Sequence, residues 1–437
     1  LRTGGSKNLI IRNGRVIDPA TGREGVETIY VKDDKISEQY ADKYADRIVD
    51  AKGFYVMPGL IDLHVHLRDP GLTYKEDVNT GARAAARGGV TTIVAMPNTK
   101  PVMDRADRIA YVNNKAKATA AVNVIQTGSV TIGQEGKELV DIRAMAKAGV
   151  PALSEDGKSV MNALLMHQAM EIAAEEDMVI LDHCEDKSLV NGGCVNADAY
   201  TEQLGLPGIT NSVEDTITAR DILLAAETGC RLHLCHVSTK GATEMLRLAR
   251  KKGYKVSGEV CPHHFTLTSS DIVPGDSNYK MNPPLRTRAD KEALIEGLKD
   301  GTFEVISTDH APHAPQEKGP DLKKAAFGIV GLETSVALTI TELVDKGILT
   351  PMQMAEKMSY NPARILGIDK GSLEVGKAAD IVIIDPDREY TINVKKFASK
   401  GRNTPFDGRK VKGMVMMTVC DGCIVYENNE PGGEKND

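Results

Sequence analysis

The segment Leu60-Ile61-Asp62-Leu63-His64-Val65-His66-Leu67-Arg68 joins an apolar, strand-like run to two histidines that stand two residues apart. Because successive side chains of a strand point to opposite faces, His64 and His66 lie on the same face. Two imidazoles on one face near the end of a strand can bind one divalent cation. Two buried core histidines would give the same local pattern, so this segment alone leaves both interpretations open.

Similar short apolar runs recur along the middle of the chain, and most of the intervals between them carry a helical pattern. The eight expected strands are 60–66, 91–96, 122–127, 150–154, 178–183, 232–237, 255–260 and 303–308. The expected helices are 76–87, 159–176, 212–228, 244–252 and 290–299. This alternation predicts an α/β fold, a (β/α)8 barrel of the TIM type. A doubly wound open sheet fits less well, because no glycine-rich nucleotide fingerprint follows the first strand.

Both ends of the chain are rich in β-like runs and turns, unlike the middle. We therefore predict one small β-sandwich domain built from 7–57 and 367–430, a barrel over 58–366, and tails at 1–6 and 431–437. Near the C-terminus, Cys420-Asp421-Gly422-Cys423 lies between two β-rich runs. We interpret it as a hairpin turn rather than a zinc or redox site, since no second cysteine pair is present to complete a structural zinc site.

Composition excludes several classes of protein. The 437 residues carry a formal net charge of -7 with acidic and basic residues mixed, so no basic stripe for nucleic acid is present. No run approaches the roughly 18 apolar residues of a membrane span, and no charged-then-apolar leader opens the sequence. Seven scattered cysteines, an odd number, indicate a reducing compartment. We expect a cytoplasmic protein that binds neither nucleic acid nor membrane.

Further candidate metal ligands follow other expected strands. Asp156 comes after the fourth strand, His183 ends the fifth, His236 ends the sixth, and Asp309 follows the eighth. Active sites of barrel enzymes lie at this end of the strands, and core histidines would not all gather there. The sequence therefore predicts a metal site made by His64, His66, Asp156, His183, His236 and Asp309. Imidazole with carboxylate suits zinc, although other divalent metals remain open.

Four motifs carry a resemblance to a known family: His64 to Arg68, Met96-Pro97-Asn98-Thr99, Asn282-Pro283-Pro284-Leu285-Arg286, and Ser307 to His313. Together they resemble dihydroorotases of the amidohydrolase superfamily, over nearly the whole chain. The C-terminal Asn361-Pro362-Ala363-Arg364 and Gly376-Lys377-Ala378-Ala379-Asp380 resemble the return to the small β domain that many amidohydrolases share.

The resemblance implies reversible hydrolysis of the cyclic amide of dihydroorotate to N-carbamoyl-L-aspartate, in de novo pyrimidine biosynthesis, with one or two Zn²⁺ ions. Asp309 would contact the metal and shuttle the proton from water to the ring nitrogen. Arg68 can grip the substrate carboxylate bidentately. The resemblance adds Asn98 and His313 to that role and Asn282 to the ring edge. It also adds Phe327 and Gly328, at the end of a Gly/Lys-rich run, 314–328, that is either a lid or a disordered loop.

One departure leaves the number of metals open. Many relatives bridge two metals with a carboxylated lysine after the fourth strand, whereas Asp156 occupies that place here, as in a bacterial subgroup. Lys158 lies two residues further on and is not expected to replace it.

Two other functions stay open. Hydantoinases, dihydropyrimidinases and allantoinases open similar rings that lack the carboxylate, and a non-catalytic amidohydrolase-like scaffold subunit is a rival of another class. We expect a small-molecule substrate, a homodimer, and a possible complex with aspartate carbamoyltransferase.

Overall fold

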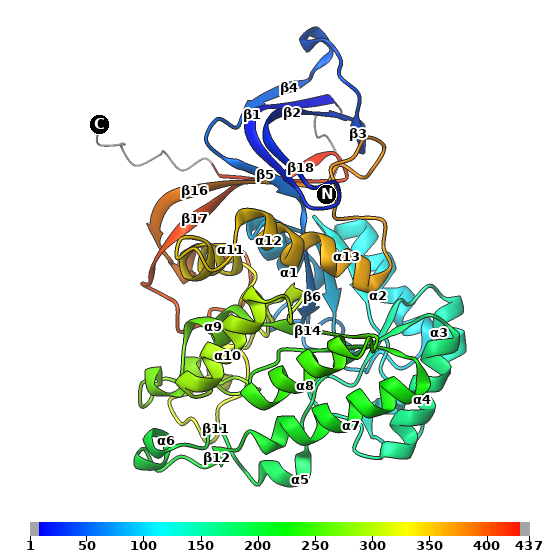
Figure 1. The fold of residues 1–437 in the computed structure, drawn as a ribbon, viewed down its shortest axis with the longest axis vertical. Helices are drawn as coiled ribbons and strands as arrows, with labels where there is room; N and C mark the ends of the chain where they lie inside the picture. The colour runs from blue at the N-terminus through cyan, green and yellow to red at the C-terminus, as the bar shows by residue number, and fades with distance from the viewer. Residues whose placement is uncertain (1–7, 429–437) are drawn as a thin grey trace.

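The computed structural model describes residues 8–428 and divides into a barrel and a β-sheet that covers one of its ends (Figure 1). The tails expected at 1–6 and 431–437 lie outside the described residues. Among residues 8–428, no helix combines the length and the apolar character that a membrane crossing requires.

Eight parallel strands form the barrel, as predicted. They are β6 (Leu60–Val65), β7 (Val90–Ala95), β8 (Asn123–Gln126), β9 (Ala152–Ser154), β10 (Val179–Asp182), β13 (Arg231–Leu234), β14 (Val256–Val260) and β15 (Val305–Ile306). Strands β6 to β8 make one run and β9 to β15 the other. Parallel bridges between Gly128 and Leu153 and between Val65 and His310 join the two runs into a closed ring.

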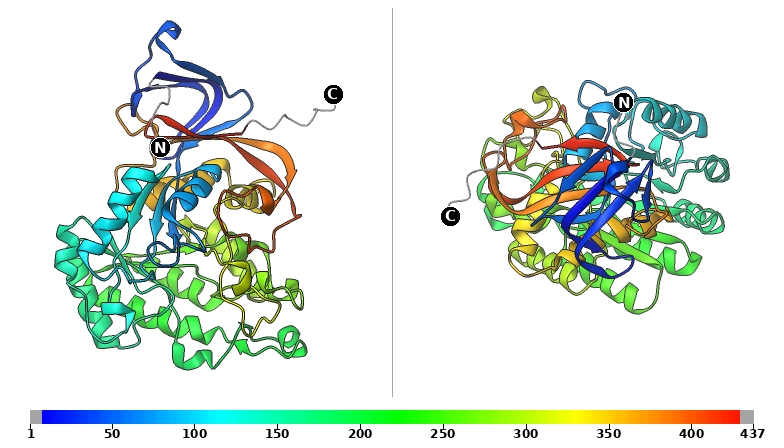
Figure 2. Two further views of the ribbon diagram at one scale, coloured as in Figure 1. Left: turned by 180° about the vertical axis from the view of Figure 1, so that it is seen from behind. Right: turned by 90° about the horizontal axis from the view of Figure 1, so that it is seen from above.

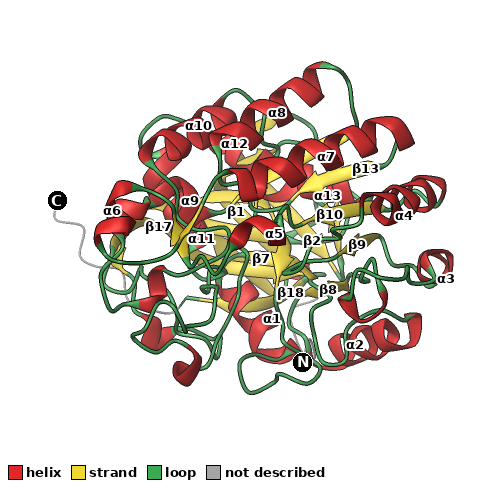
Figure 3. Ribbon diagram, turned by 90° about the horizontal axis from the view of Figure 1, so that it is seen from below, coloured by secondary structure: helices red, strands yellow, loops and turns green. Residues whose placement is uncertain are grey.

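Helices surround this ring of strands (Figure 3). Those that follow barrel strands along the chain are α1 (Val78–Arg87), α2 (Ala106–Thr119), α3 (Ile142–Lys147), α4 (Ala163–Glu175), α7 (Ser212–Thr228), α8 (Lys240–Lys251) and α10 (Arg288–Lys299). After β15, the helical segments are α11 (Ser335–Thr339), η6 (Ile340–Val344), α12 (Pro351–Ala355), η7 (Glu356–Tyr360) and α13 (Asn361–Leu366). The five expected helices are present, and α2 and α3 occupy intervals for which no helix was predicted.

Several shorter elements lie in the loops that connect the longer strands and helices. The connection from β10 to α7 contains α5 (Lys187–Val190), β11 (Val195–Asn196), α6 (Ala199–Gln203) and β12 (Gly208–Ile209), and α9 (Pro262–Thr266) follows β14. The remaining short turns are η1 (Asp42–Tyr44), η2 (Ile132–Gln134), η3 (Ser269–Asp271), η4 (Ser277–Tyr279), η5 (Pro315–Glu317) and η8 (Val394–Lys396).

The small β domain is one eight-stranded sheet to which both ends of the chain contribute. Its strands are β1 (Asn8–Asp18), β2 (Arg23–Lys32), β3 (Lys35–Ser37), β4 (Arg47–Asp50), β5 (Tyr55–Pro58), β16 (Ile381–Thr391), β17 (Lys410–Cys420) and β18 (Cys423–Glu427). Antiparallel pairing of β5 with β16 joins the two ends, and the domain has an apolar core of its own. The sheet covers the end of the barrel at which β6 begins (Figure 2), so the opposite end stays open for the site.

The predicted hairpin turn is confirmed. Cys420 and Cys423 face each other in the β17–β18 ladder, and Asp421 and Gly422 between them have φ angles of 46° and 75°. Two consecutive positive φ angles are typical of the two-residue turn that matches the twist of a hairpin.

Candidate metal centre and substrate cavity

The six predicted metal ligands converge at the C-terminal mouth of the barrel. Each lies at or within three residues of a strand end: His64 and His66 at β6, Asp156 after β9, His183 after β10, His236 after β13, and Asp309 after β15. All are buried, with exposed fractions of 0 to 6%. The closed ring therefore brings together side chains separated by up to 245 positions, 309 minus 64, in the sequence.

Asp156 lies at the middle of the imidazoles. Its Oδ1 is 3.1 Å from Nε2 of His64, 3.5 Å from Nδ1 of His183 and 3.8 Å from Nε2 of His236, and its Oδ2 is 3.4 Å from Nε2 of His66. Lys158, in contrast, donates from Nζ to the backbone oxygen of Gln134 at 3.1 Å. The carboxylate of Asp156 thus occupies the position from which a shared ligand would contact all four histidines.

Asp309 adds a second carboxylate beside Nε2 of His64 and Nε2 of His66. Its Oδ1 is 3.0 Å from Nε2 of His66 and 3.6 Å from Nε2 of His64. Asp309 and His236 have positive φ angles of 47° and 34°. Such angles are costly for residues with a Cβ, and they concentrate at functional sites because the surrounding structure enforces them.

These side chains fit a divalent cation. Nε2 of His64, which faces Asp156, is buried and makes no well-aligned hydrogen bond among the described residues. Candidate ligand atoms of His64, Asp156 and His236, and of His64, His66 and Asp309, lie within 4.8 Å of one another. Burial raises the pKa of Asp156, but the neighbouring imidazoles of His64 and His66 outweigh it and hold that pKa well below its usual range. The carboxylates thus require positive charge at this point, which a bound ion supplies.

Glu259 fixes the orientation of His64 through a hydrogen bond to Nδ1 of the ring. The sequence analysis did not identify Glu259 as a residue of the site. Nδ1 of His64 donates to Oε1 of Glu259 at 3.1 Å, Nε2 of His233 donates to Oε2 at 3.0 Å, and the backbone NH of His236 donates to Oε1 at 3.1 Å. Donation from Nδ1 leaves the Nε2 lone pair of His64 directed at the centre, as metal ligation requires. The available signal was a glutamate inside an otherwise buried strand, since unpaired glutamates are almost never fully buried.

Asn98 orients His66 in the same way. Nδ1 of His66 donates to Oδ1 of Asn98 at 2.9 Å, and Nδ2 of Asn98 donates to Oδ2 of Asp156 at 3.1 Å. Glu185, a second carboxylate that the sequence analysis missed, lies 3.3 Å from Nε2 of His183 and accepts from Nδ2 of Asn282 at 2.9 Å. Two of the expected substrate residues, Asn98 and Asn282, are therefore linked by hydrogen bonds to metal-ligand candidates.

A cavity of about 200 Å³ opens beside these ligands. The structure brings all six expected substrate-binding residues to its wall, namely Arg68, Asn98, Asn282, His313, Phe327 and Gly328. His66, Asp156, His183 and Asp309 also line it, whereas His64 and His236 do not.

One end of the cavity is electropositive. Arg68 is 8% exposed, and its Nε donates to the backbone oxygen of Pro312 at 3.3 Å. Burial together with the charges of Arg68 and Lys75 lowers the pKa of His313 to about 3, so this imidazole is neutral at physiological pH. Its Nε2 donates to the backbone oxygen of Phe327 at 2.8 Å. A buried guanidinium in such a wall favours an anionic group on the ligand.

The run 314–328 is folded against the barrel instead of being a disordered loop. Nζ of Lys318 donates to the backbone oxygens of Lys280, Ala326 and Gly328 at 3.1, 2.9 and 3.1 Å. The Nζ of Lys280 lies 4.3 Å from the ring centroid of Phe327. These contacts hold Phe327 and Gly328 at the cavity wall.

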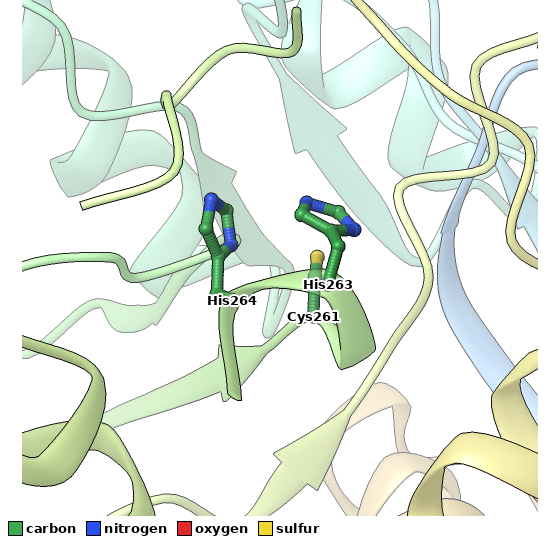
Figure 4. Close-up of side chains that lie close together, drawn as sticks. All are labelled: Cys261, His263 and His264. Carbon is green, nitrogen blue, oxygen red and sulfur yellow. The ribbon is translucent and has the colours of Figure 1, made fainter. Parts of the chain in front are cut away.

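His263 and His264, which follow strand β14, are buried and do not line the cavity. Figure 4 shows them beside Cys261 at the start of α9, with the two rings on the same side of the turn. Nε2 of His264 donates to the backbone oxygen of Pro283 at 3.0 Å and thereby fixes the segment that follows Asn282. Their place is therefore behind the cavity wall rather than at its surface.

Comparison with known proteins agrees with this architecture. A family described as "Dihydro-orotase-like" matches residues 53–242. The chain is 47% identical to a dihydroorotase of Pelotomaculum thermopropionicum and to one of Clostridioides difficile, in each case over 422 residues that cover 96% of this chain and 99% of the relative. Among solved structures, an L-hydantoinase from Arthrobacter aurescens superposes with a TM-score of 0.85 at 29% identity, covering 98% of both chains.

Proposed function

This chain belongs to the dihydroorotase family of amidohydrolases, and from that membership we propose which of its side chains carry out each part of the reaction. The protein is a hydrolase acting on a cyclic amide, a dihydroorotase: it interconverts dihydroorotate and N-carbamoyl-L-aspartate in pyrimidine biosynthesis. The family is metal-dependent, and the site offers suitable ligand groups.

We propose that the metal is zinc and that one or two ions bind. The residues that would hold it are His64, His66, Asp156, His183, His236 and Asp309, with Asp156 shared if two ions bind. The chemistry of the donor set supports this assignment, because imidazole and carboxylate suit borderline divalent ions. When bound, such an ion polarises the amide carbonyl and makes water acidic enough to attack it near neutral pH.

Asp309 moves the proton. Burial raises its pKa, but the neighbouring imidazoles of His64, His66 and His236 outweigh burial and lower that pKa, so Asp309 is ionised and can act as a base. It accepts a proton as the water oxygen bonds to the carbonyl carbon. It then gives this proton to the ring nitrogen as the carbon–nitrogen bond breaks, and ring closure uses the same steps in reverse.

Specificity comes from the electropositive end of the cavity. Arg68 binds the substrate carboxylate with help from Asn98 and His313, while Asn282, Phe327 and Gly328 contact the ring edge. The observation that carries this proposal is the placement of Arg68 and His313 in the wall of a small cavity that Asp309 also lines. A ring without a carboxylate, such as a hydantoin, would leave the buried guanidinium without its partner.

Purified, metal-loaded protein tests the assignment. We expect it to open dihydroorotate and close N-carbamoyl-aspartate, and to prefer them strongly to dihydrouracil. Equal turnover of dihydrouracil would favour the hydantoinase class, and no turnover of any ring amide would favour a scaffold subunit.

We further propose a cytoplasmic homodimer that can associate with aspartate carbamoyltransferase. The free, buried thiols Cys184, Cys235 and Cys261 beside the site support a reducing compartment. Light scattering of the protein alone and mixed with that enzyme tests both assemblies, and a monomer in each case would contradict them.

A further inference from the structure

The connection between β16 and β17 leaves the small β domain and runs down the barrel. Backbone NH groups of Ala398 and Ser399 donate to Glu333 at 2.8 and 3.1 Å, and the hydroxyl of Ser399 donates to Glu76. Nζ of Lys400 donates to the backbone oxygen of Thr73 at 2.6 Å. This connection is therefore fastened to the barrel just before it reaches the mouth.

Asn403, three residues further on, links two loops of the cavity wall. Its Oδ1 accepts from the backbone NH of His313 at 3.0 Å, and its Nδ2 donates to the backbone oxygens of Ala311 and Gly328, both at 3.0 Å. Its own backbone oxygen accepts from Val330 at 2.9 Å. The side chain is 5% exposed, so these bonds form away from water.

Only an amide meets these requirements. The position needs one acceptor and two donors within reach of three backbone groups, and asparagine supplies them with little rotamer freedom to lose. Aspartate has the same shape and could still accept from His313, but it would direct a carboxylate oxygen at the two carbonyls of Ala311 and Gly328.

The two loops are also packed too tightly to move independently. Gly328 has a φ of 124°, and a Cβ placed on it would lie 2.6 Å from the Cβ of Ala311 and 3.3 Å from Nε2 of His313. A shift at the amide of Asn403 is therefore transmitted directly to His313 and Gly328.

We propose that Asn403 is a positioning residue through which the small β domain sets the selectivity of the cavity for a carboxylate-bearing ring. It touches neither the six metal-ligand candidates nor Arg68 by a hydrogen bond, and acts by holding His313 and Gly328 in place. The inference rests on the proposed function, since His313 is there assigned to the substrate carboxylate.

The test compares Asn403→Asp and Asn403→Ala with wild type on dihydroorotate and dihydrouracil. We expect KM for dihydroorotate to rise about 10- to 100-fold, the effect of displacing a substrate-positioning group by roughly an ångström. We expect kcat and dihydrouracil turnover to change little, because the metal-ligand candidates and Asp309 keep their contacts. Asn393→Asp is the matched control: this exposed asparagine of the same connection caps η8 through a bond from Lys395 and should leave every parameter unchanged.

Unchanged selectivity in folded Asn403→Asp would overturn the proposal, as would an equal loss on both substrates, which indicates a merely structural role. If Asn403→Ala does not fold, the isosteric aspartate variant still decides. Failure of the proposed function is seen separately, because wild type itself would then not discriminate between the two rings.

Discussion

The substitution Glu259→Gln tests the negative charge of the carboxylate that accepts a hydrogen bond from Nδ1 of His64. The carboxylate is 0% exposed and accepts three hydrogen bonds, from His64, His233 and the backbone of His236. Burial raises its pKa, but the bonds from His233 and His64 more than offset this and lower that pKa, so the group is ionised. A glutamine of the same size can be accommodated if its amide oxygen faces His64 and His236.

The amide NH2 group would then face Nε2 of His233, and that ring can change tautomer. In the other tautomer Nδ1 carries the proton and donates to Oγ of Ser257, which lies 2.8 Å away. The substitution therefore removes a charge without leaving a buried polar group unpaired. Loss of such an outer partner costs about 10- to 100-fold in metal affinity, which corresponds to about 1.4 to 2.7 kcal/mol.

The assay is competition with a chelator of known affinity, followed by kcat at saturating zinc. We expect weaker metal binding with kcat largely recovered once the site is saturated. Metal affinity equal to that of wild type would refute the reasoning that Glu259 polarises His64.

Glu214→Gln is the matched control. Glu214 is also buried, at 3% exposed, and accepts from the backbone NH groups of Ser238 and Thr239 at 2.8 and 3.3 Å. Its hydrogen bonds reach none of the six metal-ligand candidates. We expect this variant to lose about 1–3 kcal/mol of stability and to keep wild-type metal affinity.

Three further predictions concern proton transfer, specificity and pH. Asp309→Asn should retain metal but lose about 10²- to 10⁴-fold in kcat, because an amide cannot take up the proton; near-normal turnover would reject the shuttle role. Arg68→Lys should raise KM for dihydroorotate by about tenfold, since the bidentate contact is lost, while dihydrouracil turnover stays the same; parallel changes in both would contradict a carboxylate-specific role. Burial raises the pKa of Glu333 from 4.5 to about 7, so the folded state binds this proton more tightly than the unfolded state. Stability from this group is present below pH 4.5 and lost as pH rises through about 7, by up to about 3 kcal/mol. In thermal unfolding between pH 4 and 8, the stability of Glu333→Gln should depend less on pH than that of wild type. An unchanged pH profile would show that another group is responsible.

The strands and the ligands that follow them were predictable because barrel strands are buried on both faces. A run such as Val179–Asp182 is therefore short, apolar and sharply bounded, and His183 stands out at its end. In a parallel barrel all such ends meet at one mouth, so the convergence of His64 with Asp309 follows from the fold class alone.

Helices α2 and α3 were not predictable from the same signals. Only Ile109, Val112 and Ala116 of α2 are buried, and its N-cap, Arg105, makes no side-chain cap. Helix α3 has six residues, too few for a periodic pattern to stand out. Both are stabilised mainly by docking on the barrel, which the local sequence does not encode.

Hydrogen-bond partners that are distant in the sequence could not be predicted either. The local sequence does not indicate which distant backbone group a polar side chain will contact. Asn403 resembles any loop asparagine before a threonine and a proline, yet it bonds to residues 75 to 92 positions away. Glu259 was visible as a charge in a buried strand, but its pairing with His64 depends on strand order around the ring.

The register of β14 shows that the same residues specify both fold and site. His233 pairs with Ser257, so Glu259, two residues on, faces the barrel interior, whereas Gly258 faces the helices. A Cβ at Gly258 would lie 2.7 Å from Cδ2 of Leu246. A slip of one residue would turn Glu259 or Ser257 toward this apolar contact and leave a buried charge without a partner. The alternative register is thus excluded by sterics on one face and by electrostatics on the other, and the register that remains is the one that presents a carboxylate to His64.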